Sequence, residues 1–353
     1  MYFTGLATAT PATRYTKLEC WEAFRRSEWF ERLDVRTRAV ARAVLLGDNG
    51  MEARWLALES LSEVFRIDPD TLHGRFLAHA PSLAARAGAG ALDDAALTAR
   101  EIDAVVVSTC TGYLCPGLTS YLIERLGLAP DTPAFDLVGQ GCAAALPNMR
   151  LAQALLGSGA CRHVLSICVE VSSAAMYLDD DIGVMVSACL FGDGAGAAVL
   201  SAQPPDERRR RIAWRGCESL LEPRAREALR FEHRGGMLRN VLTRAVPALA
   251  AEHAERVLAA LLARTGLERG DISAWIMHAG GRDVLRALEE RLRLDPGALR
   301  YSAAVLREYG NLSSAFVYFV LRAALADAAP GGWWWLGSFG AGFSCHAALL
   351  EVD

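Results

Sequence analysis

The sequence predicts an α/β fold built from two similar halves. Residues 100–112 (REIDAVVVSTCTG) are echoed by residues 270–281 (GDISAWIMHAGG), and both segments lead from an apolar, strand-like run into a glycine turn. The motif FGDGAG at 191–196 is echoed by FGAG at 339–342, and each continues into an apolar segment. The same order of motifs in both halves indicates an internal duplication. The alternation of strands and helices also predicts mainly parallel sheets covered by helices.

Composition sets the broad class of the protein. The chain has 353 residues, which is enough for two domains or one large α/β unit. Apolar residues make up 52% and charged residues 22%, as in an ordinary globular protein, and a net charge of −4 gives no reason to expect a nucleic-acid partner. The nine cysteines show no paired CxxC spacing, which favours reduced intracellular thiols over disulfides or a metal site.

Neither a signal peptide nor a membrane span is predicted. Residues 1–5 lack the basic-then-apolar pattern of a signal peptide. Residues 183–202 are almost uncharged, but Asp193 and the glycines around it favour adjacent buried strands over a transmembrane helix. We therefore expect a cytoplasmic protein.

The predicted first half, residues 1–202, opens with a helical region. Charged and apolar residues alternate at helical spacing over residues 14–90. Arg38, Arg42 and Arg54 lie in this region, where they either face solvent or contact the phosphates of a coenzyme.

The rest of the first half reads as strands and helices in turn. β-branched residues predict strands at 102–109 and 163–170, and a helix between them ends near Gly127. The apolar segment 190–200 closes this half.

Residues 203–235 are predicted to be a polar connection between the halves. They contain Pro204-Pro205, the arginine run 208–211 and Gly235-Gly236. No aromatic residues are interleaved with the arginines, so a solvated loop is favoured over nucleic-acid contact. A helix is predicted from about 238 to 265, within a second half at 236–353.

Cys142 is the first candidate catalytic residue. It follows Gly139 and Gly141 and opens a segment of small, helix-favouring residues. Unpaired N–H groups and the helix dipole at such a position lower the pKa of a thiol and favour the nucleophilic thiolate. The alternative is a buried structural cysteine.

His278 and Asn311 complete a candidate site. The repeat places His278 at the end of the first strand of the second half, where functional groups gather in α/β sheets. Asn311 lies in EYGNLSSA, a glycine turn entering an apolar helix. Alone, each could be a structural residue or a helix cap. A cysteine, a histidine and an asparagine at element ends together suit acyl chemistry, which needs a cation beside the thiolate and donors for an oxyanion.

These motifs resemble one family. GQGCAAALPN around Cys142, HAGG at 278–281, EYGNLSSA around Asn311 and FGDG at 191–194 resemble the type III polyketide synthases, the chalcone synthase-like family. The resemblance implies a thiolase-like fold with duplicated halves in αβαβα layers and a homodimer. It also implies acyl-CoA and malonyl-CoA as substrates, with no permanently bound cofactor.

The resemblance assigns roles to individual residues. Cys142 matches the acyl-accepting nucleophile, His278 the imidazole that stabilises its thiolate, and Asn311 the amide that stabilises a thioester enolate. Phe191 matches the phenylalanine between the coenzyme A tunnel and the reaction cavity. Ser313 and Gly340 lie in the matching motifs and are also expected at the substrate site.

Several positions depart from the family pattern. Asn240 falls where a second gating phenylalanine is usual, and Ala175 and Cys110 fall at cavity positions often held by threonine. Cys115 stands where a residue, usually methionine, reaches into the partner subunit's site. The coenzyme A phosphate contacts do not align, which leaves Arg38 and Arg42 as candidates.

Three interpretations follow. The first is a type III polyketide synthase, for which Ala175 and Asn240 suggest a different cavity, a fatty acyl starter and an alkylpyrone or alkylresorcinol product. The second is a ketoacyl-ACP synthase III that condenses only once. The third is a catalytically silent homologue with the same fold.

Overall fold

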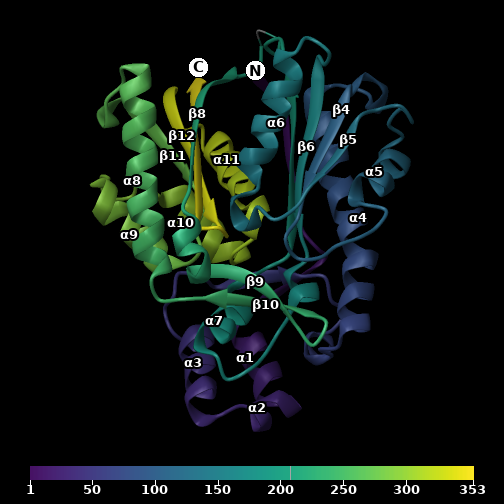
Figure 1. Ribbon diagram of the computed structural model, residues 1–353, viewed down its shortest axis with the longest axis vertical. Helices are drawn as coiled ribbons and strands as arrows, with labels where there is room; N and C mark the ends of the chain where they lie inside the picture. Colours follow the sequence, from purple (N-terminus) through teal and green to yellow (C-terminus); the bar gives the residue numbers. More distant parts are fainter. Residues whose placement is uncertain (207) are drawn as a thin grey trace.

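A mixed sheet connects the two halves of the molecule (Figure 1). The computed structural model describes residues 1–206 and 208–353, and in them the sheet has nine strands in the order β11-β12-β13-β8-β1-β7-β6-β4-β5. These strands are β1 (Tyr2–Ala9), β4 (Ala104–Ser108), β5 (Ala134–Leu137), β6 (His163–Glu170), β7 (Gly194–Ser201), β8 (Ile212–Leu221), β11 (Ile272–Met277), β12 (Gly332–Gly340) and β13 (Ser344–Val352). Two small sheets pair β2 (Thr13–Thr16) with β3 (Ala53–Leu56), and β9 (Leu229–Arg234) with β10 (Met237–Leu242).

The described residues also form α-helices. They are α1 (Lys17–Arg25), α2 (Glu28–Arg32), α3 (Val35–Leu46), α4 (Pro69–Ala95), α5 (Leu118–Leu126), α6 (Ala145–Gly157), α7 (Ile182–Leu190), α8 (Val246–Thr265), α9 (Arg282–Leu292), α10 (Arg300–Tyr309) and α11 (Phe316–Ala326). Short 3₁₀ turns add Gly141–Ala143, Ser172–Ala175 and Ser313–Ala315.

The predicted duplication is confirmed by the strand pairing. In the first half β4 pairs parallel with β6, β6 antiparallel with β7, and β7 antiparallel with β1. In the second half β11, β12, β13 and β8 repeat the same sequence of parallel, antiparallel and antiparallel pairs. The two sets meet where β1 pairs with β8 at Tyr2 and Ala213.

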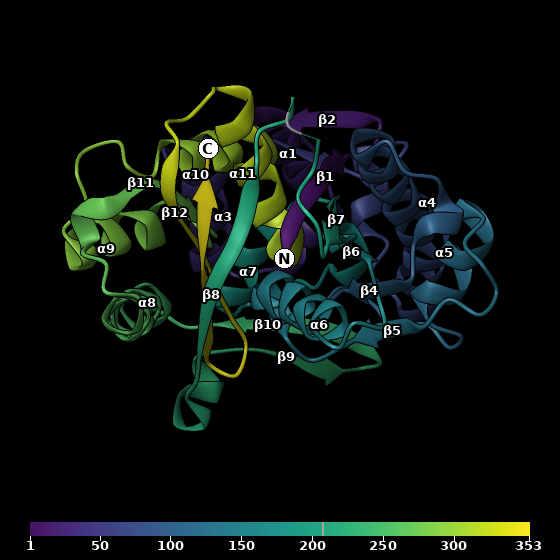
Figure 2. The ribbon, with the colours of Figure 1, turned by 90° about the horizontal axis from the view of Figure 1, so that it is seen from above.

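Helices form the layers that the resemblance implies (Figures 1 and 2). The central helices α6 and α11 contact strands of both half-sheets. Residues 316–321 and 324 of α11 are buried, as expected for a largely apolar helix between two sheets. The helices α4 and α5 cover the outer face of one half-sheet and α8, with α9 against it, covers the other. The result is the αβαβα order.

A cap lies below these layers in Figure 1. It contains α1–α3, α7 and the β9–β10 hairpin. Its core includes Trp21, Phe24, Leu45 and Met185. The carboxyl ends of β4, β6, β11 and β12 face this cap, so groups at these strand ends can meet a common cavity.

Two predictions about the strands are wrong. The sheet is mixed rather than mainly parallel, because β12 and β13 are joined by a turn of only three residues, which requires an antiparallel pair. Residues 183–202 were predicted as adjacent buried strands, but residues 182–190 form α7. Asp181 caps this helix by accepting hydrogen bonds from the N–H groups of Gly183 (2.8 Å) and Val184 (3.2 Å).

The boundary of the second half also differs from the prediction. The segment 203–235 contains β8, which pairs with β13 over its whole length and so belongs to the second half-sheet. Its arginines contact the protein itself: Arg211 pairs with Asp353 at 2.9 Å and Arg210 lies over the Trp334 ring at 5.0 Å. Residues 237–242 form β10, and the predicted helix begins only at Val246.

Among the described residues, none of the helices is both long enough and apolar enough to cross a membrane.

Candidate active site

Cys142 lies on a tight turn between β5 and α6. Gly139 and Gly141 adopt φ values of +80° and +56°, which glycine reaches without strain. The nucleophile candidate is only 7% exposed. The end of β12 presses against the same turn: a Cβ at Gly340 would lie 2.6 Å from the N atom of Ala143. Gly340 therefore allows a close backbone approach and contributes no side chain to a substrate site.

Two side chains surround the sulfur of Cys142. Ser313 Oγ donates a hydrogen bond to Cys142 Sγ at 3.2 Å. Ser313 Oγ also lies 3.1 Å from Cys110 Sγ. Either atom can be the donor in this second contact. Ser313 has φ +51°, an uncommon value for a residue with a side chain, which is typical of functional sites.

The environment favours the thiolate at Cys142. Hydrogen bonds from Cys110, His278 and Ser313, together with the positive charge of His278, hold the pKa of the Cys142 thiol well below its usual range although burial opposes this. The pKa of Cys110 is raised well above its usual range by its hydrogen bond to Cys142 and by burial. Cys142 therefore ionises and Cys110 stays a thiol that donates to it.

His278 follows β11 directly, as the repeat predicts. Its backbone N–H donates to Gly337 O on β12 at 2.9 Å. The ring lies between Phe316 and Phe339, with centroids 5.2 Å and 5.0 Å away. Its Nδ1 atom is buried without a hydrogen-bond partner among the described residues, so the imidazole is positioned by packing and by Cys142.

Asn311 is held by both its backbone and its side chain. Its N–H donates to Leu190 O at 2.9 Å, and its carbonyl accepts from Gly192 N at 3.0 Å, which joins it to the Phe191 segment. Asn311 Oδ1 accepts from Ser313 N at 2.9 Å, and Nδ2 donates a long 3.3 Å bond to Gly280 O. The second N–H of the amide remains for a ligand.

Glu170 is a residue that sequence reasoning missed. It ends β6 and is fully buried, and burial raises the pKa of its carboxyl. Its carboxylate accepts from Cys110 N (3.1 Å) and Thr111 Oγ1 (2.9 Å), and from the hydroxyl of Ser314. It thus ties the Cys110 loop to the Ser313 turn. The sequence feature that could have identified Glu170 is an acidic residue at the end of a mostly apolar strand.

Cys142, His278 and Asn311 line one cavity of about 690 Å³, together with Phe191 and Asn240. The structure thus brings these five predicted site residues together from both halves. The mouth of the cavity carries Arg244 and the half-exposed Arg282, which pairs with Asp48 at 3.2 Å.

The arginines singled out from the sequence do not line this cavity. Arg38 lies over the Phe30 ring at 5.1 Å and Arg42 is exposed on α3. Arg54 is buried, and its guanidinium donates to Ala188 O (2.6 Å) and Phe191 O (3.1 Å). Arg54 therefore holds the end of α7 and faces no coenzyme.

A second cavity adjoins the first, and a third adjoins the second. Ala175, Asn240, Phe191 and Phe231 line a space of only about 30 Å³. Cys110 and Phe231 line another of about 590 Å³. Ala175 therefore lies beside a small space, which Phe231 also lines.

Among the described residues, no group of three or more histidine, cysteine or acidic side chains could hold a metal ion.

Two family models match most of the chain. Residues 220–350 match chalcone and stilbene synthases, C-terminal domain, and residues 75–216 match FAE1/type III polyketide synthase-like protein.

Characterised relatives span nearly the same length. The chain is 30% identical to 3,5-dihydroxyphenylacetyl-CoA synthase of Streptomyces toyocaensis, over 98% of this chain and 89% of the relative. It is 34% identical to 1,3,6,8-tetrahydroxynaphthalene synthase of Streptomyces peucetius subsp. caesius, over 86% of this chain and 81% of the relative.

Solved structures share the whole fold. PKS-I from the brown alga Ectocarpus siliculosus superposes with a TM-score of 0.90 at 26% identity, covering 99% of this chain and 98% of that one. The 1,3,6,8-tetrahydroxynaphthalene synthase of Streptomyces coelicolor A3(2) superposes with a TM-score of 0.88 at 25% identity, covering 99% of both chains.

The lowered pKa of Cys142 leads to the first prediction. Cys142 should react with iodoacetamide at pH values well below about 8.5, the usual thiol pKa, because the thiolate persists there. In His278→Ala the pH midpoint should rise, since a hydrogen bond and a positive charge are lost. Peptide-resolved mass spectrometry measures the rates, and Cys142→Ala serves as the control that subtracts the exposed Cys115. An unchanged midpoint in His278→Ala would remove the histidine from this role.

Proposed function

The chain belongs to the type III polyketide synthases, and on this basis we propose that Cys142 carries the acyl chain while His278 and Asn311 promote its extension with malonyl-CoA. The observation that supports this most is that the thiolate, the imidazole and the amide line one cavity. The chain is an acyltransferase of the decarboxylating, condensing kind. Membership of this family favours it over the single-condensing synthase and over a silent homologue.

Loading begins with the Cys142 thiolate. It attacks the thioester carbonyl of an acyl-CoA, so a new C–S bond forms and the bond to coenzyme A breaks, which releases the coenzyme A thiolate. The position at the start of α6 favours negative charge on sulfur. The Ser313 and Cys110 donors keep the thiolate ionised between cycles.

Extension requires a stabilised enolate. When malonyl-CoA loses CO₂, the electron pair of the broken C–C bond is delocalised onto the thioester oxygen. His278 and the free N–H of Asn311 can donate hydrogen bonds to that oxygen. Preorganised donors of this kind typically contribute a few kcal/mol each. The enolate carbon then attacks the Cys142 thioester, and the sulfur leaves as the thiolate that the site favours.

Arg244 and Arg282 replace Arg38 and Arg42 as candidates for coenzyme A phosphates. They lie at the mouth of the catalytic cavity, and Arg282 is the first residue of α9. A helix start and a guanidinium both favour phosphate.

A short starter fits the cavities better than a fatty acyl group. The fatty acyl hypothesis requires room beyond Ala175, where the space is about 30 Å³. The relatives described above are named as synthases of compact dihydroxyphenyl and naphthalene products. We therefore propose a short acyl or malonyl starter whose extended chain cyclises to a compact aromatic or pyrone product.

A homodimer is the proposed assembly. Cys115 is exposed on the loop that also carries Tyr113, which is 70% exposed, and Val138 nearby is 60% exposed. A second copy of the chain would cover these apolar side chains. Light scattering that gives the mass of a single chain at micromolar concentration would contradict this assembly.

The acylation site gives the second prediction. Incubation with acetyl-CoA or malonyl-CoA should place the acyl group on Cys142, and Cys142→Ala should lose both the adduct and polyketide formation while keeping the fold. Peptide mapping identifies the modified residue, and circular dichroism checks the fold of the variant. An acyl group found on another residue, Cys110 included, would contradict the assignment.

The cavity mouth gives the third prediction. Arg282→Ala should raise KM for malonyl-CoA about fivefold, corresponding to roughly 1 kcal/mol for an exposed ion pair, and leave kcat almost unchanged. The effect should shrink at high salt because exposed charges are screened. Arg291→Ala is the control, since Arg291 lies on the same helix and pairs with Glu255 at 2.7 Å. Equal KM values in both variants would mean that Arg282 does not contact the phosphates.

A further inference from the structure

The β9–β10 hairpin forms a wall shared by all three cavities. It is separate from the central sheet. Across it Asn240 pairs with Phe231, and Arg239 pairs with Glu232. Because successive strand residues point to opposite faces, Arg239 and Asn240 face opposite sides of β10.

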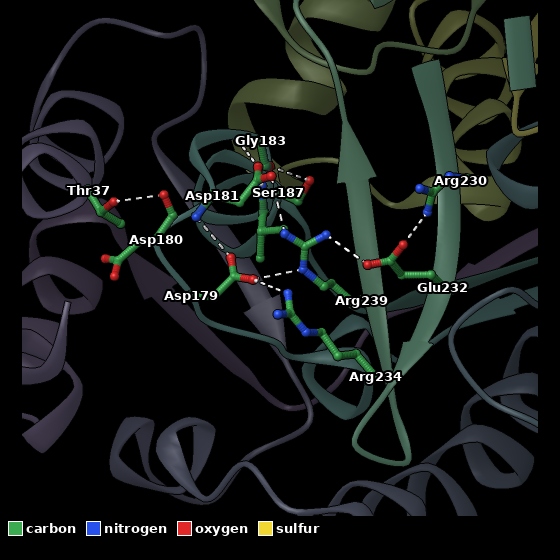
Figure 3. Close-up of polar contacts among 11 residues, drawn as sticks. Thr37, Asp179, Asp180, Asp181, Gly183, Ser187, Arg230, Glu232, Arg234 and Arg239 are labelled. Carbon is green, nitrogen blue, oxygen red and sulfur yellow. Dashed lines mark hydrogen bonds and ion pairs between the residues drawn. The ribbon is translucent and has the colours of Figure 1, made fainter. Parts of the chain in front are cut away.

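Arg239 occupies a cluster of carboxylates between the hairpin and the start of α7. Figure 3 shows its guanidinium directed at Asp179, Asp181 and Glu232. The distances are 2.8 Å, 3.2 Å and 3.0 Å, and its side chain is 9% exposed. The contacts to Asp179 and Asp181 join β10 to the residues before α7, and the contact to Glu232 joins β10 to β9.

The contacts of Arg239 also lie where β10 approaches α7. Asp181 caps α7 with one carboxylate oxygen while the other faces Arg239. A Cβ at Gly183 would lie 1.9 Å from Leu242 O, so helix and strand are in backbone contact. Because α7 leads directly into Phe191, these contacts join the strand that carries Asn240 to the helix that ends at Phe191.

Asn240 lies at the junction of the catalytic cavity and the 30 Å³ cavity, and it lines both, as Phe191 does. It is 8% exposed, and its Oδ1 atom is buried with no hydrogen-bond partner among the described residues. A buried, unpaired amide in a cavity wall is costly unless a ligand completes its hydrogen bonds.

Three hydroxyl groups in the wall of the 30 Å³ cavity already have partners. Thr111 Oγ1 donates to Glu170, Ser172 Oγ to Gly192 O, and Ser187 Oγ to Gly183 O. Asn240 therefore supplies hydrogen-bonding capacity that these neighbours do not.

We propose that Asn240 binds the keto oxygens of the growing β-ketoacyl chain and that Arg239 is the positioning residue that holds it at the junction. This inference rests on the proposed function. An enolised 1,3-diketone offers one acceptor and one O–H donor, and a carboxamide offers one N–H donor and one acceptor to match them. A simple acyl starter such as acetyl lacks this pair of oxygens until it has been extended, so the contact selects for extended chains.

The test compares loading with extension in Asn240→Leu, which keeps the volume of the side chain and removes its hydrogen bonds. With malonyl-CoA, the ratio of products with two or more extensions to products with one should fall about fivefold or more relative to any loss in Cys142 acylation. Coenzyme A affinity, measured by calorimetry, separates a contact with the extending chain from one with the coenzyme arm. A parallel loss in coenzyme A affinity and acylation, or an unchanged product ratio, would overturn the proposal.

Arg239 is tested in the same assay by a double-mutant cycle. Arg239→Lys should lower the product ratio when Asn240 is present and have little further effect in Asn240→Leu, because it acts through the asparagine. A merely structural role would lower thermal stability and every step equally in both backgrounds, and would overturn the positioning role. Arg234→Lys is the matched control, since Arg234 also faces Asp179, at 3.6 Å, but is exposed.

The wild-type protein in this assay distinguishes a failure of the proposed function from a failure of the role of Asn240. Absence of extended products from the wild type overturns the proposed function and this inference together. Wild-type extension with an unchanged product ratio in Asn240→Leu overturns only the role of Asn240.

Discussion

A buried thiolate at Cys142 is the constraint on which the rest of the site depends. A charge that is only 7% exposed is costly unless donors compensate it, and here they come from Ser313, Cys110 and His278. Each donor has its own support. Glu170 anchors the backbone beside Cys110 and the hydroxyl beside Ser313, and packing between Phe316 and Phe339 holds the His278 ring.

The duplicated fold brings these groups together. Cys142, Cys110 and Glu170 come from the first half, whereas His278, Asn311 and Ser313 come from the second. The strand ends of both half-sheets face the same cap, and the central helices α6 and α11 begin at the two turns that carry Cys142 and Ser313. Neither half alone holds the full set of donors, so the nucleophile and the groups that serve it are separated in sequence and adjacent in space.

The sequence predicted what repeats and motifs encode. The echo of 100–112 at 270–281 located β4 and β11, and with them the strand end of His278. The glycines before Cys142 predicted its turn. The features that the sequence did not predict depend on contacts between residues that are distant in the chain. The helix α7 is made of small and β-branched apolar residues, and its cap at Asp181 was hidden in a run of three aspartates. The strand β8 exists because β13 pairs with it, which no local pattern reveals. Arg54 carries the same charge as Arg38, but burial against Phe191 makes it structural.

The central claim is that this cavity extends a chain on Cys142 more than once. The most direct measurement is product mass spectrometry after incubation with malonyl-CoA, alone and with a panel of acyl-CoAs, alongside coenzyme A release. We expect products that contain several malonyl-derived two-carbon units, with one coenzyme A released for the starter and one for each unit added. Products that stop at a single condensation, or coenzyme A release by hydrolysis alone, would contradict it.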